Sequence, residues 1–449
     1  MYRKARLRLT VLLALLMLAS VSLAGCGKGQ AGKDGDGASP SGTPTISQEP
    51  VTLTLTNHQS VGFTENDFQN YFVEPVKKKY PWITLQYIKP DKGSQLLDLI
   101  AAGQTPDLIF ASNGYFALLK QLDIMYDMNE FIKKYKVDLS IYDKPIVDRI
   151  KQAGEKGEMF SIPFSLNYGA MFYNKNIFDK FGVPYPKDLM SFEEILPLAR
   201  RINRTVDGVQ YIGFEPQYAD TIAGQLGLPK VGAGDRPTLD SPEYKRVFQF
   251  LKEVYEIPGQ IGPNGKFNWG RNAFLKDQNL AMFLDWTNDM AGPMEDAYKT
   301  GFTNWDISGL PNFQDKLGQG RTVDSHMTFI SKTSKYKEQA FLVILETVSK
   351  ETQMIVSANG RISPIPDQAI RDNYAKNFES YKGKKVQNIF LTKQTPLSQP
   401  ESNYGSQATS IVRDEQKKMA LGEKDVNTAL RDAFERIRQN VEEEKAAAK

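Results

Sequence analysis

The sequence predicts an α/β fold built in two lobes, and two observations support this prediction. Short segments typical of strands recur between amphipathic segments typical of helices, a pattern that indicates a mostly parallel sheet with helices on its faces. These segments fill residues 50–449 without an internal repeat. A stretch of about 400 residues is too long for one hydrophobic core and suits two.

The first part of this region predicts three strands and two helices. The expected strands are residues 51–56, 81–88 and 106–110, and the expected helices are residues 67–80 and 94–102. Polar turns follow the first strand at Asn57 and His58, and the third strand at Asn113. Because ligand sites in such sheets lie at the carboxyl ends of strands, these turns are candidate site positions.

The middle of the chain carries two further strand signals, at residues 170–173 and 280–284, and two helix starts. Ser191 and Glu194 have the spacing of a capping box, although we expect Pro197 to interrupt the helix that follows. Ser241 and Pro242 form a good helix start, because proline is favoured in the first turn. The apolar stripe of that helix consists of Tyr244, Val247, Phe248, Leu251 and Tyr255.

The C-terminal residues predict a strongly amphipathic helix. Its apolar face consists of Val426, Ala429, Leu430, Phe434, Ile437 and Val441. The opposite face is rich in charged side chains, and we expect solvent to surround it.

Residues 1–25 have the form of a secretory signal. A basic start with Arg3, Lys4, Arg6 and Arg8 precedes an apolar run over residues 9–23. A run of this length is short for a membrane-spanning helix, which needs about 20 residues. The segment ends in Leu23, Ala24, Gly25 and Cys26, which resembles the bacterial lipobox, in which the cysteine is lipidated. We therefore expect a lipid anchor at Cys26, followed by a flexible tether of Gly, Ser and Pro residues over 26–49.

Charge and residue types exclude several functions. Removing residues 1–25 leaves 52 basic and 53 acidic residues, so nothing indicates a nucleic-acid-binding patch. The chain has two histidines and a single cysteine, which argues against zinc sites and cysteine nucleophiles. Motifs of serine hydrolases and of P-loop nucleotide binders are missing from the sequence. We expect no metal, no cofactor and no enzymatic activity.

Five segments, taken in order, resemble the extracellular solute-binding proteins of carbohydrate ABC importers, the maltose-binding-like family. They are residues 162–164 with 171–184, residues 191–194, residues 274–286, residues 305–311 and residues 425–430. The sequence departs from the family pattern at Asn279 and at Asp285, where the family often has glycine. These departures leave the identity of the sugar open.

The resemblance implies a two-lobed fold like that of type II periplasmic binding proteins, with a ligand cleft between the lobes. By analogy, lobe one consists of residues 50–167 with 311–362, and lobe two of residues 168–310 with 363–449. It also implies a monomer anchored by lipid on the extracellular face of a cell membrane, in the manner of Gram-positive bacteria. Such a protein delivers a carbohydrate to the permease subunits of an ABC transporter.

A sugar site needs flat aromatic faces for C–H groups and planar polar side chains for hydroxyls. The resemblance places Trp286 on the aromatic wall with Asp285 beside it, Glu215 and Tyr218 in a polar segment, and Tyr404 as a late aromatic. Strand ends and the expected lobe crossing add the candidates Asn57, His58, Asn113, Tyr115, Phe164 and Asn167. Alternatives remain: core packing for Trp286, Phe164 and Tyr404, a turn role for Asn57 and Asn113, a structural role for His58, and a solvated surface position for Glu215.

Two other functions remain open from sequence. The same fold could bind a peptide, a polyamine or a metal ion, and a lipid-anchored glycoside hydrolase could use two carboxylates. Calorimetric titration with a panel of sugars, together with a check for turnover of the same sugars, separates these alternatives from sugar capture.

The lipobox yields the first testable prediction. A Cys26→Ala variant should still be exported but should carry no lipid, because the thiol that accepts the lipid is gone. Metabolic labelling with a fatty acid measures this directly. Normal lipid labelling of the variant would contradict the predicted anchor.

Overall fold

The computed structural model describes residues 47–59, 63–154, 156–399, 402, 404 and 407–447. The chain divides into two compact units, Met1–Thr45 and Ile46–Lys449, and the fold described here is that of the second unit. The predicted signal, Cys26 and most of the tether lie outside the described residues. Within the described part, none of the helices is long and apolar enough to cross a membrane.

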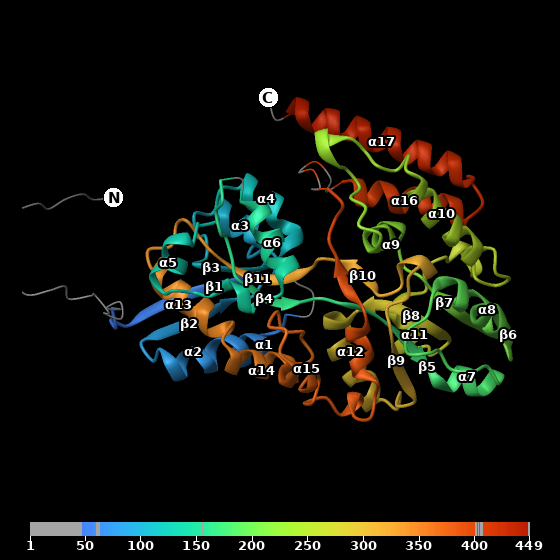
Figure 1. The fold of residues 1–449 in the computed structure, drawn as a ribbon, viewed down its shortest axis with the longest axis horizontal. Helices are drawn as coiled ribbons and strands as arrows, with labels where there is room; N and C mark the ends of the chain where they lie inside the picture. The colour runs from blue at the N-terminus through green and yellow to red at the C-terminus, as the bar shows by residue number, and fades with distance from the viewer. Residues whose placement is uncertain are drawn as a thin grey trace, which may run out of the picture. The chain divides into compact units, whose positions relative to one another are not determined.

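Two five-stranded sheets form the framework (Figure 1). The first has the order β2-β1-β3-β11-β4, and the predicted strands at its N-terminal end are confirmed. Its strands are β1 (Val51–Asn57), β2 (Ile83–Ile88), β3 (Leu108–Ser112), β4 (Pro163–Leu166) and β11 (Ser325–Ile330). Strand β1 pairs in parallel with β2 and β3, whereas β11 pairs in antiparallel fashion with β3 and β4.

Alternation along β3 explains why helices cover both faces of this sheet. Leu108 and Phe110 join one hydrophobic core, and Ile109 and Ala111 join another, because successive strand residues point to opposite faces. The helices of the Phe110 core are α1 (Glu65–Phe68), η1 (Gln69–Val73), α2 (Glu74–Lys79), α13 (Lys337–Thr347) and α14 (Lys350–Ala358). The helices nearest the opposite face are α3 (Leu96–Ala101), η2 (Asn113–Tyr115), α4 (Phe116–Gln121) and α6 (Lys144–Ala153).

The second sheet has the order β6-β7-β8-β5-β9. Its strands are β5 (Gly169–Asn174), β6 (Arg204–Val206), β7 (Val209–Glu215), β8 (Leu280–Trp286) and β9 (Trp305–Gly309). Only β7 and β8 are parallel neighbours in it, so the predicted mostly parallel arrangement is wrong for this sheet. Strand β5 enters this sheet directly from β4 of the other sheet, and its antiparallel partners β8 and β9 come from much later in the chain.

Helices of the second sheet share one large apolar core. They are α7 (Lys175–Phe181), α8 (Phe192–Ile202), α9 (Ala219–Gln225), α10 (Pro242–Tyr255), α16 (Ala408–Ala420) and α17 (Val426–Ala447). The capping box of α8 is confirmed, with the Ser191 hydroxyl accepting from Glu194 N at 3.3 Å. The expected interruption at Pro197 is wrong: α8 continues through it, because Pro197 and Glu193, one turn earlier, lie on the solvent side. The stripe of α10 is buried as predicted.

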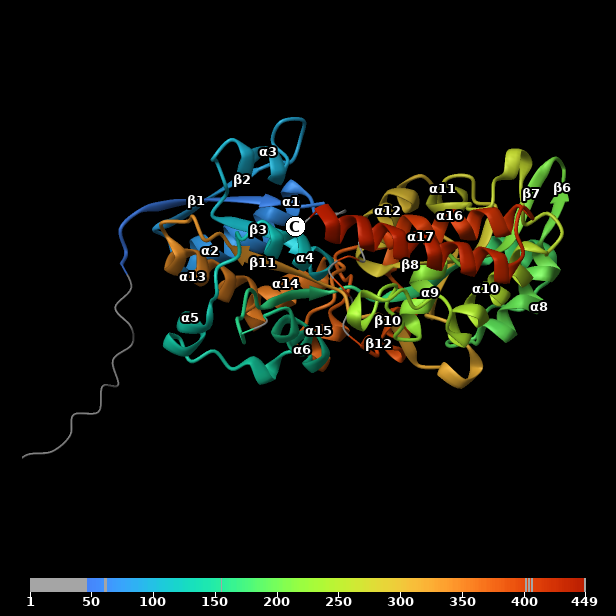
Figure 2. The ribbon, with the colours of Figure 1, turned by 90° about the horizontal axis from the view of Figure 1, so that it is seen from above.

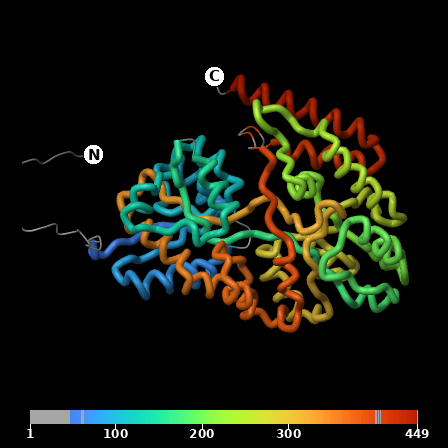
Figure 3. The backbone as a smooth tube through the Cα atoms, viewed as in Figure 1, coloured from blue at the N-terminus to red at the C-terminus, as the bar shows by residue number. Residues whose placement is uncertain are grey.

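The remaining elements connect these layers. They are α5 (Asn129–Lys134), η3 (Leu139–Ile141), η4 (Ala233–Asp235), η5 (Pro263–Gly265), α11 (Gly270–Leu275), α12 (Thr287–Lys299), η6 (Gln314–Lys316), β10 (Gln319–Thr322), α15 (Gln368–Asp372), η7 (Glu379–Tyr381), η8 (Val386–Leu391) and β12 (Lys393–Thr395). Strands β10 and β12 form a separate two-stranded ribbon. In Figure 3 the backbone of α13 and α14, far along the chain, lies among the first segments of the sequence.

The chain passes between the two sheets more than once. One passage is residues 167–168, between β4 and β5, and another is the segment 310–324, between β9 and β11. A third follows Ile362, which forms a bridge with Leu166. These passages give the fold the two-lobed organisation that the sequence predicts, while the lobe boundaries themselves stay a prediction.

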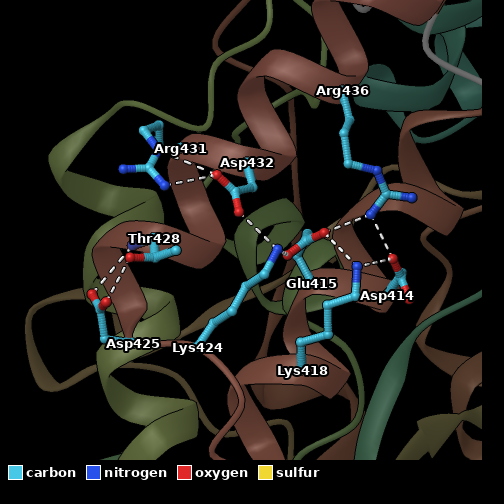
Figure 4. Close-up of polar contacts among 9 residues, drawn as sticks. All are labelled: Asp414, Glu415, Lys418, Lys424, Asp425, Thr428, Arg431, Asp432 and Arg436. Carbon is cyan, nitrogen blue, oxygen red and sulfur yellow. Dashed lines mark hydrogen bonds and ion pairs between the residues drawn. The ribbon is translucent and has the colours of Figure 1, made fainter.

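An ion network joins the last two helices, which run beside each other (Figures 1 and 2). Glu415 on α16 is fully buried and accepts hydrogen bonds from Lys418 at 2.9 Å, Lys424 at 2.5 Å and Arg436 at 2.6 Å (Figure 4). Arg436 belongs to α17, and Lys424 also bonds Asp432 of α17 at 2.7 Å. The apolar stripe of α17 packs as predicted, but the expectation that its whole charged face is solvated is wrong.

Glu415 is held in its ionised form. Burial alone raises its pKa, but the hydrogen bonds from Lys424, Lys418 and Arg436 outweigh burial and bring the pKa below its ordinary value of 4.5. A carboxylate whose pKa is lower in the folded than in the unfolded state stabilises the fold fully when the pH is above its unfolded-state pKa. This stabilisation is lost as the pH falls through the folded-state pKa.

The network predicts a pH-dependent cost for a Glu415→Gln substitution. At pH 7 the free energy of unfolding of the variant should be about 1.5–3 kcal/mol lower than that of the unchanged protein. The reason is that a neutral amide bonds the three surrounding cations more weakly than the buried carboxylate does. Below about pH 4 the difference from the unchanged protein should shrink. Urea unfolding at both pH values measures this, with Asp432→Asn, whose side chain is 30% exposed, as a milder control. Equal stability at pH 7 would contradict a role for the network.

Candidate functional site

A cavity of about 550 Å³ lies where strands of both sheets end. On the side of the first sheet it is lined by Asn113 and Tyr115, which follow β3, and by His326 of β11. On the side of the second sheet it is lined by Trp286, at the end of β8, and by Asp289 of α12. The volume is in the range of small-molecule sites, and the position agrees with the rule that such sites lie at strand ends.

Four of the predicted site residues line this cavity: Asn113, Tyr115, Asn167 and Trp286. Asn113 is tied to the backbone by its whole side-chain amide. Its Nδ2 donates to Val323 O at 3.2 Å, and its Oδ1 accepts from Ser325 N at 2.7 Å. Asn113 therefore holds the end of the 310–324 passage against β3, as well as contributing to the wall.

Asn167 plays a similar part on the passage between β4 and β5. Its backbone N donates to Asp324 O at 3.0 Å, and its Oδ1 accepts from Asn288 N at 3.3 Å. Its side chain also hydrogen-bonds the carboxyl group of Asp324. Asn167 thus links both passages to the first turn of α12.

Trp286 is partly exposed and carries a guanidinium on its ring. The Arg321 guanidinium carbon lies 4.3 Å from the ring centroid, a cation–π contact. Arg321 is only 2% exposed, and its Nη2 donates to Gln217 Oε1 at 2.6 Å. Its Nε and Nη1 have no hydrogen-bond partner among the described residues. Burial lowers the pKa of Arg321 to about 10, so it stays a cation at neutral pH.

Asp285 does not line the cavity. Its carboxylate is buried and accepts from Arg271 Nε at 2.5 Å and from Gln217 Nε2 at 3.2 Å. Arg271 also reaches Asp289 at 3.1 Å. The carboxylate that the resemblance implied as a hydroxyl acceptor is therefore already engaged inside the wall.

Three candidates near the first sheet, Asn57, His58 and Phe164, do not line the cavity. His58 contacts the ring of Tyr115 edge-on, with centroids 4.6 Å apart, and neither of its ring nitrogens has a hydrogen-bond partner in the described part of the chain. Burial lowers the pKa of His58, which keeps it neutral. Asn57 donates to the Tyr87 hydroxyl at 2.7 Å, and Phe164 packs among aromatic rings of the core.

Three candidates of the second lobe also lie away from the cavity lining. Glu215 is 1% exposed and accepts from Trp269 N at 2.8 Å and from Gln217 N at 3.2 Å. The Tyr218 hydroxyl accepts from Asn268 at 2.6 Å, with a guanidinium over its ring. Tyr404 packs against the core of the second sheet.

Sequence reasoning missed the acidic lining of the cavity. Asp220 of α9, Asp289 and Asp324 all line it, as does Asp148 of α6. Asp289 could have been found, because it comes three residues after Trp286, a predicted site residue. Asp324 carried no signal, since its segment has neither a strand nor a helix pattern. No cluster of side chains suited to a metal ion occurs among the described residues.

Two sheets joined by several passages, with a cavity at their strand ends, define the class of two-lobed solute-binding proteins. The family model described as bacterial extracellular solute-binding protein matches residues 72–382, and the chain belongs to this family. The resemblance to extracellular solute-binding proteins is thereby confirmed, and membership of this family agrees with the expectation that the protein is not an enzyme.

Individual relatives agree with this assignment. The maltotriose-binding protein of Pyrococcus abyssi is 26% identical over 192 residues, which cover 42% of this chain and 39% of the relative. The arabinooligosaccharide-binding protein of Halalkalibacterium halodurans is 24% identical over 253 residues, which cover 51% of this chain and 52% of the relative. The matches thus span about half or less of these curated relatives.

Solved structures show the same fold over most of the chain. An ABC substrate-binding protein from Listeria monocytogenes, in complex with cycloalternan, superposes with a TM-score of 0.71 at 19% identity, covering 87% of this chain and 99% of that one. The sugar-binding protein MalE from Xanthomonas citri gives a TM-score of 0.66 at 15% identity, covering 88% and 99%. The predicted two-lobed binding-protein fold is therefore confirmed.

The interior position of Glu215 yields a prediction about pH. Burial raises the pKa of Glu215 to about 7, although the backbone hydrogen bonds from Trp269 and Gln217 oppose this rise. The folded protein then holds this proton more tightly than the unfolded chain, so stability falls as the pH rises from about 4.5 to 7. A Glu215→Gln variant has no carboxyl group to ionise at this position, so its stability should not fall in this way.

Relative to the unchanged protein, Glu215→Gln should gain stability across this pH range, by up to about 3 kcal/mol. Urea unfolding of both proteins at pH 4.5, 6 and 8 measures the difference. A difference that is constant with pH would show that Glu215 has the same pKa in the folded and unfolded states, as expected of a group open to solvent, and would contradict the raised pKa.

Proposed function

We propose that this protein is a lipid-anchored extracellular solute-binding protein that captures a carbohydrate, in particular an oligosaccharide, and delivers it to the permease of an ABC transporter. The observation that carries the proposal is the combination of aromatic rings and planar polar groups around one cavity, with Trp286 and Tyr115 supplying the rings. A sugar presents both C–H faces and hydroxyls, so it matches both kinds of group.

The contact between the Arg321 guanidinium and the Trp286 ring favours Trp286 as the aromatic platform on which a sugar ring packs. An indole has two faces, and the guanidinium covers one of them. Trp286 is partly exposed and lines the cavity, and the face that Arg321 leaves uncovered would suit the apolar face of a sugar ring. Arg321 is buried and fixes the orientation of the ring before a ligand arrives, which reduces the entropy lost on binding.

Names of relatives favour an oligosaccharide over a single sugar. Curated relatives are named for maltotriose and for arabinooligosaccharides. Structures with the same fold hold oligosaccharides, such as cycloalternan and mannobiose, and also the single sugar α-D-tagatose, so the preference rests on the curated relatives. A cavity of about 550 Å³ is consistent with more than one sugar ring.

A cationic solute such as a polyamine is less favoured, despite the acidic lining. Asp220 receives two hydrogen bonds from Arg413, both at 2.9 Å, and Asp289 is paired with Arg271. Asp148 is paired with Lys144 one turn away. Most of the negative charge is therefore neutralised by the protein's own cations, which leaves little to attract a polycation.

Attachment and delivery complete the proposal. Lipidation at Cys26 would keep the protein at the extracellular face of the membrane, and the tether over residues 26–49 would let it reach a permease. The described lobes would act as a monomer, closing around the sugar by differential contact with the closed state.

A Trp286→Ala substitution tests the platform. Loss of the indole should weaken sugar binding by about 2–4 kcal/mol, or roughly thirtyfold to a thousandfold in affinity. Stability should fall less than the 3–5 kcal/mol typical of a fully buried tryptophan. Calorimetric titration with maltotriose, mannobiose and arabinooligosaccharides, together with thermal unfolding, measures both effects.

Trp82 provides a matched control, since it is also partly exposed but packs against the core of the first sheet. Trp82→Ala should lower stability without changing affinity. A Trp286→Ala protein that binds sugar normally but unfolds much earlier would show that Trp286 is a core residue. Failure of the unchanged protein to bind any sugar of the panel would contradict carbohydrate capture.

A further inference from the structure

One carboxylate of the cavity differs from the others. Asp148, Asp220 and Asp289 are each paired with a lysine or an arginine. Asp324 also lines the cavity and is partly exposed, but it forms no ion pair within the ranges that the structure describes. Its carboxyl group accepts hydrogen bonds from the Asn167 side chain and the Ser325 backbone N–H, both of which are neutral donors. Among the described residues, Asp324 is therefore the one carboxylate of the cavity lining that has no ion-pair partner.

The backbone around Asp324 is fixed from three directions. Its carbonyl oxygen accepts from Asn167 N at 3.0 Å and from Gln394 Nε2 at 2.8 Å. The residues on either side of it are bonded to the Asn113 side chain. A side chain on such a rigid support is positioned before a ligand arrives, as a specificity-determining group requires.

Charged and titratable groups approach Asp324 from several elements. Asp289 faces it from α12 and Arg321 from β10. Tyr115 of η2 and His326 of β11 line the same cavity. Burial raises the pKa of Asp324 to about 6 and Asp289 adds to this rise, while Asn167 and Arg321 oppose it. Burial lowers the pKa of His326 to about 3, so His326 stays neutral when Asp324 titrates.

We propose that Asp324 is a specificity-determining residue of this cavity, whose carboxylate accepts hydrogen bonds from hydroxyl groups of the captured sugar. The inference rests on the proposed function and adds the residue that selects the ligand. A hydrogen bond to an ionised acceptor is about twice as strong as one between neutral groups. A sugar with a hydroxyl group at Asp324 should therefore bind more tightly than a sugar that has no hydroxyl group there.

Proton linkage follows from this role. Hydrogen bonds donated to a carboxylate favour its ionised form and lower its pKa. Sugar binding should therefore release a proton near pH 6, and the affinity should rise between pH 5 and pH 7.5. A residue that only supports the fold would not produce proton release on binding.

The experiment is calorimetric titration of the tightest-binding sugar among maltotriose, mannobiose and arabinooligosaccharides, at pH 5 and pH 7.5. Two buffers with different ionisation enthalpies at pH 6 give the number of protons released. Asp324→Asn should bind about tenfold or more weakly at pH 7.5, with no proton release and little change with pH. The variant should fold, because Asp324 is held through its main chain.

Asp315→Asn is the matched control. Asp315 lies on the same passage between the sheets, but it is outside the cavity and pairs with Arg246 at 2.7 Å. This variant should keep the affinity and the proton release. Sugar binding by the unchanged protein that takes up protons or is independent of pH would overturn the inference, as would Asp324→Asn binding with normal affinity. Absence of sugar binding in all proteins would instead contradict the proposed function.

Discussion

The cavity depends on the hydrogen bonds that hold residues 323–325. This short segment ends one passage between the two sheets, and Asn113, which directly follows β3, binds it through both the nitrogen and the oxygen of its amide. The backbone of Asn167, on another passage, binds its central carbonyl. An unmet buried backbone group costs about 1–3 kcal/mol, so these bonds fix the segment firmly. They set where Asp324 and His326 stand relative to Trp286.

The buried guanidinium of Arg321 is the second constraint, and it explains a glycine. Arg321 lies against Trp286 on one side and close to Gly169, the first residue of β5. A Cβ atom at Gly169 would come within 2.5 Å of Arg321 Nε. Any side chain there would displace the arginine and with it the orientation of the indole. The start of β5 and the position of Trp286 in the cavity wall therefore both depend on the close approach of Gly169 and Arg321.

Local sequence patterns predicted the helices and strands well, and the resemblance predicted the family. Neither predicted the side-chain contacts between segments that are far apart in the sequence. The capping box at Ser191 and the stripe of α10 depend on neighbours in sequence, so they were readable. The position of Asp324 depends on Asn113, more than two hundred residues earlier. Asp285 was recognised as a candidate beside Trp286. Its pairing with Arg271 could not be predicted, because the alternation of side chains along the strand turns Asp285 away from the cavity. Pairing of β5 was mispredicted for the same reason: its partners come from distant parts of the chain.

The central claim is that a sugar binds in the cavity at the strand ends, against Trp286. A crystal structure of the protein with the oligosaccharide that binds most tightly tests it most directly. The account predicts a sugar ring on the indole face opposite Arg321, with the two lobes drawn closer around it. A sugar bound at another surface, or one in the cavity that leaves Trp286 without a contact, would contradict the account.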